Sequence, residues 1–262
     1  ADYGVFYIDA LTYQPMCGAG TLSVAKVLVE TGMVKRVEPE TKIVLETPTG
    51  LVTVYVKWEN HMVASINLEN VPAFLYRKEL HIDLAGYGDV SVDIGYGGNF
   101  FVLADVHSLG LTITKDTVNL LRSLSKDILA AANKVIKVAH PTNPAINYLD
   151  QVLFCQNVPE EDGGYLAQCI FGDAQADISP CGTGTSTRLA QRYFRGLIGL
   201  EETFVQKSVC GGAFHAKGLR ETTLGGVPAI VPYVSCSDVH ITGFNHLIVE
   251  ENDKLKNGFV SW

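Results

Sequence analysis

The chain lacks any apolar run long enough to cross a membrane, and no signal-peptide pattern opens it. It also lacks clusters of basic residues: 20 lysines and arginines stand against 28 acidic residues, which gives a formal net charge of −8. Because neutralising phosphates requires clustered basic side chains, a nucleic-acid partner is disfavoured. These absences favour a cytoplasmic protein that works with neither membrane nor nucleic acid.

Cysteine is present but sparse. Six cysteines among 262 residues, without regular spacing, do not indicate a disulfide scaffold. There is no CxxC pair, and the seven histidines do not stand at ligand spacings beside cysteines, so we expect no metal site. Walker A and Rossmann glycine patterns are also absent, and no lysine is singled out as a pyridoxal-phosphate anchor. We therefore expect no cofactor.

An internal repeat is the most informative pattern that is present. Cys17–Thr21 (CGAGT) recurs as Cys181–Thr185 (CGTGT). Further matches at the same spacing are Asp9 with Asp173, Ala10 with Ala174, and Gly32 with Gly196. Each copy predicts the same unit: an apolar strand, a turn containing proline, the cysteine, and an amphipathic helix that ends at a glycine.

The rest of the chain is mostly strand-like. Period-two alternation predicts strands at Val63–Leu68 and Asp89–Asp93. Helical spacing of apolar residues predicts one long helix from about Asp116 to Lys137, ended by His140-Pro141. The first copy lacks the β-rich run that precedes the cysteine of the second copy. We therefore expect an α/β fold of the α+β type with two pseudo-symmetric lobes, the first of them N-terminally incomplete.

The glycines after each repeated cysteine indicate a helix N-terminus with open backbone amides. Such amides and the helix dipole bind anions, and they lower the pKa of a thiol from its usual value of about 8.5. Two such helix starts, related by a pseudo-two-fold axis, would hold a small carboxylate between two sulfurs. One thiolate could remove the α-proton while the opposite thiol protonates the other face. We therefore predict that Cys17 and Cys181 are the acid–base pair of a cofactor-independent amino-acid racemase or epimerase.

Other candidate residues have simpler interpretations. Asp173 is expected in a turn, and Tyr96 and Phe100 in the core. His246 could line the cleft, although a hydrogen-bonded structural role is favoured. Cysteines without the glycine–helix context are expected to be small buried residues; these are Cys155, Cys169, Cys210 and Cys236.

Two segments carry a family resemblance. Met16–Thr21 (MCGAGT) and Ser179–Ser186 (SPCGTGTS) resemble the two signatures of the proline racemase and 4-hydroxyproline 2-epimerase family. Further landmarks, in the expected order, are Asn70–Phe74, Asp93–Phe101 (DIGYGGNFF), His140-Pro141, Gly243–Asn245 and Asn257–Phe259. The resemblance covers essentially the whole chain. It implies a diaminopimelate-epimerase-like fold, in which two α/β lobes each wrap strands around a central helix and the active site lies between them.

The resemblance also implies roles for single residues. Cys17 and Cys181 would be the two acid–base residues, and Asp177 would bind the ring nitrogen of the substrate. The amides that would cradle the substrate carboxylate belong to Gly18, Ala19, Gly182 and Thr183. Family members usually carry histidine where this chain has Ala19. We expect the first lobe to comprise residues 1–77 and 239–262, and the second lobe residues 78–238.

Racemisation or epimerisation at the α-carbon of proline or hydroxyproline is the expected function, with this small molecule as the partner and a homodimer as the default assembly. A trans-3-hydroxyproline dehydratase is the first alternative. Because such dehydratases replace one cysteine with serine or threonine, cysteine at both positions favours epimerisation. The second alternative is a catalytically silent paralogue that acts as a binding protein, suggested by Ala19 and by the incomplete first lobe.

Overall fold

A computed structural model describes residues 1–9, 13–245 and 248–257. Its helices are α1 (Gly18–Glu30), α2 (Val118–Val135) and α3 (Gly182–Phe194), with a short 3₁₀ turn at His107–Leu109. The strands are β1 (Tyr3–Gly4), β2 (Tyr7–Ile8), β3 (Tyr13–Gln14), β4 (Glu40–Thr47), β5 (Gly50–Glu59), β6 (Met62–Glu69), β7 (Phe74–Leu84), β8 (Gly88–Tyr96), β9 (Phe100–Asp105), β10 (Gln151–Cys155), β11 (Tyr165–Phe171), β12 (Gln175–Ala176), β13 (Phe204–Lys207), β14 (Ala213–Leu224) and β15 (Val227–Cys236).

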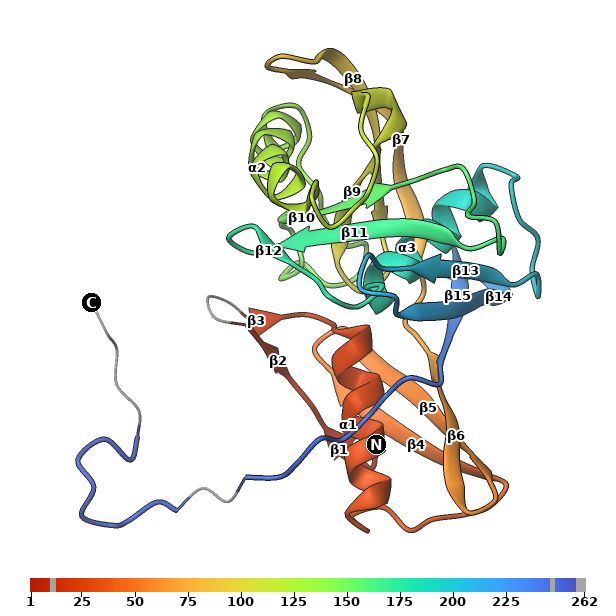
Figure 1. Ribbon diagram of the computed structural model, residues 1–262, viewed down its shortest axis with the longest axis vertical. Helices are drawn as coiled ribbons and strands as arrows, with labels where there is room; N and C mark the ends of the chain where they lie inside the picture. The colour runs from red at the N-terminus through yellow and green to blue at the C-terminus, as the bar shows by residue number, and fades with distance from the viewer. Residues whose placement is uncertain (10–12, 246–247, 258–262) are drawn as a thin grey trace.

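Most strands join one continuous, largely antiparallel sheet. Its order is β1-β4-β5-β6-β15-β14-β13-β11-β10-β9-β8-β7, with β12 paired to β11, while β2 and β3 form a separate hairpin. The pairing of β6 with β15 links two lobes, which lie one above the other in Figure 1. The expectation of an α/β fold with two lobes is therefore confirmed.

The first lobe packs α1 against β5 and β6. Its buried residues recur every three or four positions, so they form one stripe that faces the sheet; they are Gly18, Thr21, Leu22, Ala25, Leu28 and Val29. The helix ends at Thr31, and Gly32 follows with a φ of +72°, a left-handed conformation that glycine adopts at little cost. The glycine stop predicted from the repeat is therefore confirmed.

The second lobe encloses α3 among strands of its sheet (Figure 1). The helix contacts β7, β8, β9, β14 and β15, and every residue from Gly182 to Ala190 is buried. The side chain of Arg188 on α3 is fully buried among these strands, and its guanidinium donates to the backbone oxygens of Leu166 (3.1 Å) and Gln156 (2.7 Å). Because a buried guanidinium needs acceptors on several sides, these bonds fix α3 against the neighbouring strands.

The predicted long helix is observed as α2, which covers the outer side of the second lobe (Figure 1). Its buried residues, Leu121, Leu124, Ser125, Ile128 and Ala132, again form one stripe.

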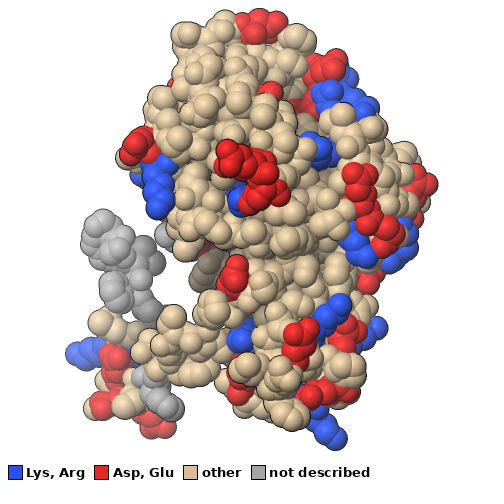
Figure 2. All heavy atoms as spheres, turned by 45° about the vertical axis from the view of Figure 1, so that its right-hand side comes forward, with Lys and Arg blue, Asp and Glu red and all other residues tan. Residues whose placement is uncertain are grey.

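Among the described helices, none is both long and apolar enough to cross a membrane. On the face shown in Figure 2, basic side chains lie in small groups among acidic ones and form no broad patch.

The far end of α3 is fixed by an ion pair. Arg195 donates two hydrogen bonds of 2.8 Å to the carboxylate of Asp93 on β8, which also accepts from Gln191 at 2.7 Å. Although burial opposes ionisation, these donors hold the pKa of Asp93 below its ordinary value. Asp93, the first residue of the DIGYGGNFF landmark, therefore anchors the C-terminal end of α3 to β8.

Most local predictions are confirmed. Strands occur at Val63–Leu68 within β6 and at Asp89–Asp93 within β8, and Tyr96 and Phe100 are buried. Asp173 lies in the turn between β11 and β12, as expected. For Cys210 the prediction of burial is wrong. It is exposed, because it lies in the tight turn that joins β13 to β14.

We propose that the lobes divide close to the predicted boundaries. The boundary at residue 77 falls within β7, and the one at residue 238 falls just after β15. Val239 and His240 border the same cavity as Ala19 and Leu22 of α1. Because Pro180 and Phe214 of the second lobe also line this cavity, the assignment of the segment after β15 to the first lobe stays a proposal.

The two lobes meet where α1 and α3 begin. A Cβ built on Gly18 would lie only 2.7 Å from the Cα of Gly182, and a Cβ built on Gly182 would lie 2.7 Å from the Cα of Gly18. Side chains other than hydrogen therefore cannot occupy either position without separating the helix starts. The reciprocal contact identifies this point as the centre of the pseudo-symmetry.

Replacing Gly18 with alanine tests this contact. We expect Gly18→Ala to lower the free energy of unfolding by about 1–3 kcal/mol, because its methyl group must displace the backbone of Gly182. Urea denaturation followed by circular dichroism measures the change. Gly4→Ala is the matched control, since a Cβ at Gly4 would meet nothing within 4 Å. Equal stability of the two variants would contradict the close packing.

Candidate active site

Cys17 forms the N-cap of α1. Its extended backbone conformation (φ −136°, ψ 108°) lets its sulfur accept a hydrogen bond from the N–H of Gly20 at 3.3 Å, while its carbonyl accepts from Thr21 at 2.9 Å. A sulfur in this position takes the place that serine or aspartate oxygen usually occupies at helix starts. The prediction of a cysteine at a helix N-terminus is therefore confirmed.

Cys181 forms the N-cap of α3 in the same way. Its sulfur accepts from the N–H of Gly184 at 3.3 Å, and its carbonyl accepts from Thr185 at 2.7 Å. Unlike Cys17, it has a positive φ of 65°, which costs a residue with a side chain about 1–3 kcal/mol. The surrounding loop must therefore hold Cys181 firmly.

Hydrogen bonds from three neighbours fix that loop. Ser179 accepts from the N–H of Cys181 at 3.0 Å and donates its own N–H to a carboxylate oxygen of Asp177 at 2.8 Å. The Gln206 side chain donates to the carbonyl of Pro180 at 2.7 Å, and Gln168 donates to the carbonyl of Asp177 at 2.8 Å. Both the cysteine and the aspartate are thus positioned before any ligand binds.

One small cavity brings together every residue predicted for the site. It measures about 140 Å³, well below the roughly 300–1,000 Å³ typical of sites for drug-sized ligands. The predicted residues among its lining are Cys17, Gly18, Ala19, Asp177, Cys181, Gly182 and Thr183. A larger cavity of about 450 Å³ lies beside Asp93 and Arg195 and contains none of them.

Two helix N-termini and one carboxyl group, that of Asp177, border this cavity. Neither α1 nor α3 has an acidic residue in its first turn, and the described residues lining the cavity include no lysine or arginine. The first amides of each helix have no carbonyl partner within the helix. The cavity can therefore attract a small anion through backbone N–H groups and two helix dipoles.

Burial works against ionisation of the groups in the cavity. It raises the pKa of Cys17 to about 11, because desolvation and the nearby Cys181 and Asp177 outweigh the hydrogen bond from Gly20. Burial also raises the pKa of Asp177, against hydrogen bonds from Ser179 and Cys181. For Cys17 the sequence-based expectation of a lowered pKa is wrong, since desolvation exceeds the effect of the helix N-terminus.

The DIGYGGNFF landmark forms the third wall of the site. A Cβ on Gly97 would lie 2.6 Å from the carbonyl oxygen of Thr183, and one on Gly98 would lie 2.8 Å from the side chain of Met16. Asn99 donates to the carbonyl of Met16 at 2.8 Å, and Asn70 donates to the carbonyl of Gly97 at 3.0 Å. The turn therefore contacts the segments that begin both helices.

Sequence reasoning missed several residues of the cavity. Asn99 lines it, and its side-chain oxygen is buried without a partner in the described part of the chain. Gln14 and Gln151 also line it and hydrogen-bond to each other at 3.0 Å. Asn99 belongs to the DIGYGGNFF landmark, although that pattern assigns it no role. No local pattern marks Gln14 or Gln151, because they come from separate strands that meet only in the folded chain.

Cys169 is the most consequential residue that the sequence did not mark. The prediction that it is a small buried residue is confirmed, but Cys169 also lines the cavity next to Cys181. Hydrogen bonding to Cys181, together with burial, raises the pKa of Cys169 well above its ordinary range. The signal that could have found it is the β11–β12 hairpin, whose pairing of Ile170 with Ala176 brings Cys169 opposite Asp177.

Three features singled out from the sequence lie outside the described residues. They are Ala10 of the repeat, His246, and the Gly258-Phe259 portion of the last landmark. The described parts of the two C-terminal landmarks, Gly243–Asn245 and Asn257, are exposed and do not line the cavity.

Comparisons with known proteins agree with this geometry. A family model described as "Proline racemase" matches residues 1–260. A proline racemase of Acetoanaerobium sticklandii is 38% identical over 260 residues, which cover 99% of this chain and 77% of that protein. A trans-3-hydroxy-L-proline dehydratase of Burkholderia cenocepacia is 36% identical over 261 residues, with the same coverage.

A solved structure shows the same fold. A hydroxyproline epimerase from Agrobacterium vitis, with bound trans-4-OH-L-proline, superimposes with a TM-score of 0.89 at 29% sequence identity. The match covers 98% of this chain and 74% of that one. Because the family model spans nearly the whole chain and the racemase and dehydratase relatives exceed 30% identity over it, this chain belongs to the proline racemase family.

Proposed function

We propose that this chain racemises or epimerises proline or hydroxyproline at the α-carbon, without a cofactor, through Cys17 and Cys181. The observation that carries the proposal is that both cysteines cap helices whose first turns meet at one small cavity. The names of its relatives, which include a proline racemase and a hydroxyproline epimerase, support this substrate class.

The substrate carboxylate would bind at the paired helix N-termini. The amides proposed to hold it are those of Gly18, Ala19, Gly182 and Thr183. With no lysine or arginine among the described lining residues, these amides and the two helix dipoles supply the positive potential. They would also stabilise charge that moves onto the carboxylate when the α-proton leaves.

The substrate amine would bind Asp177. Its carboxylate lies in the same cavity as Cys181 and is oriented by the N–H of Ser179. In the first lobe, Ala19 stands where the family resemblance implies a histidine, and it offers no side-chain partner. Recognition of the amine would therefore depend on the second lobe.

Proton transfer would use the cysteines in opposite roles. A thiolate on one side of the α-carbon removes the proton, and the thiol on the other side returns a proton to the opposite face. The roles exchange in the reverse direction. The burial that raises the pKa of Cys17 makes its thiolate rare but strongly basic, which suits removal of a weakly acidic α-proton.

Two further expectations stay predictions. The six cysteines are all unpaired, which supports the proposed cytoplasmic location, since reduced thiols persist there. The homodimer rests on the frequency of such assemblies alone.

Single cysteine variants test the two-base mechanism. We expect Cys17→Ala and Cys181→Ala each to lower racemisation by about 10²–10⁴-fold, because each removes one proton-transfer group. Each variant should still exchange the α-proton with D₂O from one enantiomer, and the two variants should act on opposite enantiomers. Proton NMR of L- and D-proline and of the hydroxyprolines measures both reactions.

Cys155→Ala is the control, since Cys155 is a buried cysteine outside the cavity. Exchange from the same enantiomer in both cysteine variants would contradict the mechanism.

Formation of a pyrroline product by the unmodified protein would identify a dehydratase. Binding of pyrrole-2-carboxylate in calorimetry without any turnover would identify a silent binding protein.

The raised pKa of Cys17 predicts how its alkylation depends on pH. Only the thiolate reacts, so modification by iodoacetamide should rise about tenfold for each pH unit between 7 and 10. A free thiol with a pKa of about 8.5 would instead level off above pH 9. Mass spectrometry of the Cys17 peptide, with N-acetylcysteine as reference, measures this. A plateau of the alkylation rate near pH 8.5 would show that burial does not raise the pKa of Cys17.

Ala19→His tests the proposed dependence of amine binding on the second lobe. We expect the imidazole to add one hydrogen bond to the substrate amine and to lower KM by about 2- to 12-fold, which corresponds to roughly 0.5–1.5 kcal/mol. Ala19→Leu, which adds similar bulk without a polar group, is the control. If both variants raise KM equally, the space at position 19 is not part of the amine site.

A further inference from the structure

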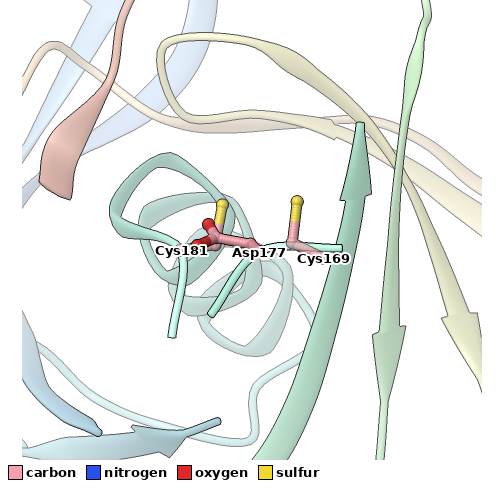
Figure 3. Close-up of side chains that lie close together, drawn as sticks. All are labelled: Cys169, Asp177 and Cys181. Carbon is pink, nitrogen blue, oxygen red and sulfur yellow. The ribbon is translucent and has the colours of Figure 1, made fainter. Parts of the chain in front are cut away.

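Three possible metal ligands converge in the cavity. One sulfur each from Cys169 and Cys181 and one carboxylate oxygen from Asp177 all lie within 4.8 Å of one another. Figure 3 shows the two sulfurs pointing the same way, with the Asp177 carboxylate beside Cys181. Within the described residues, this is the one cluster of at least three such groups.

The spacing suits a soft divalent cation. Tetrahedral zinc binds thiolate sulfur at about 2.3 Å and carboxylate oxygen at about 2.0–2.2 Å, so two sulfurs on one ion stand about 3.8 Å apart. Closing from at most 4.8 Å to that separation requires a shift of about 1 Å. Side-chain rotation alone can supply a movement of this size.

The backbone around the cluster is already fixed. The N–H of Asp177 donates to the carbonyl of Cys169 at 3.0 Å, and the Gln168 side chain donates to that same carbonyl at 3.0 Å. Ser179 positions both Asp177 and Cys181. The backbone that carries the three metal ligands therefore needs little ordering when an ion binds, and this reduces the entropic cost of binding.

The surroundings leave the cluster accessible to a cation. All three residues line the cavity, whose described lining includes no lysine or arginine. Two thiolates and one carboxylate would bring three negative charges, which exceed the partial positive charges of the two helix termini. The remaining space of the cavity, toward Cys17, provides a fourth coordination position for water. Two thiolates and one carboxylate match the ligands that zinc prefers.

We propose that Cys169, Asp177 and Cys181 form an inhibitory binding site for a thiophilic divalent cation such as Zn²⁺. Each thiol releases its proton to water as its sulfur bonds to the metal, so two protons leave for each ion that binds and no oxidation occurs. The bound ion occupies the cavity and holds the sulfur of Cys181, which prevents proton transfer by that cysteine. Zinc here is a reversible inhibitor and takes no part in the reaction.

Cadmium provides a direct probe of the site. Titration of the fully reduced chain with Cd²⁺ should give a thiolate-to-cadmium charge-transfer band in the ultraviolet that saturates at one ion per chain. Cys169→Ala and Cys169→Ser should each weaken binding at least about 10-fold, since even outer-shell partners of metal ligands contribute about 10- to 100-fold. The serine variant keeps the size of the side chain, so a folding defect would not imitate the loss.

Two other cysteines serve as matched controls. Cys155→Ala removes a buried cysteine on the adjacent strand, and Cys210→Ser removes an exposed one. Both should bind Cd²⁺ as tightly as the unmodified chain. Absence of the band in the unmodified chain, or equal binding by the Cys169 variants, would overturn the proposal.

A second measurement tests inhibition, and this part rests on the proposed function. Zn²⁺ should slow α-proton exchange by the unmodified protein, and a chelator should restore it. The Cys169 variants, each compared with its own metal-free rate, should require at least about 10-fold more Zn²⁺. If the chain turns over no proline derivative, the proposed function fails, while the cadmium titration still decides whether the metal site exists.

Discussion

The packing of Gly18 against Gly182 is the contact on which the geometry of the site depends. Because neither residue has a side chain, the first turns of α1 and α3 approach until a Cβ on either would lie 2.7 Å from the other backbone. The two capping cysteines, the open amides and the positive ends of both helix dipoles then border the same cavity of about 140 Å³. Gly97 and Gly98 continue this pattern, since their lack of side chains lets the adjoining turn contact both helix starts.

The same close packing sets the acid–base properties of the site. Burial of Cys17 and Asp177 raises the pKa of both groups, although backbone amides partly oppose the effect at Cys17. A buried thiol is thus protonated at neutral pH, and a thiolate formed there is a strong base. In the proposed mechanism, the helix termini bind the substrate carboxylate, while burial makes the Cys17 thiolate strongly basic. Substrate recognition and proton transfer therefore use different groups at the helix starts.

The two lobes are alike in backbone and unlike in chemistry. Both capping sulfurs accept an N–H bond of 3.3 Å, from Gly20 and from Gly184. Asp177 and Cys169 belong to the second lobe alone, whereas the first lobe offers Ala19. A β-hairpin precedes each helix, β2–β3 before α1 and β11–β12 before α3, so the asymmetry lies in the side chains that the two lobes carry and not in the backbone. Amine recognition and the proposed zinc site therefore lie on one side of the cavity.

The sequence by itself determined the helix starts at Cys17 and Cys181, the glycine stop after α1, the long helix α2 and the strands at Val63–Leu68 and Asp89–Asp93. These features depend on capping and periodicity within a few residues, so they are visible without the fold. It could not determine that Cys169 lies in the cavity, that Cys210 is exposed, or that burial raises the pKa of Cys17. Only the tertiary structure decided these points, because they depend on how distant strands return and on how much water the closed interface between the lobes excludes.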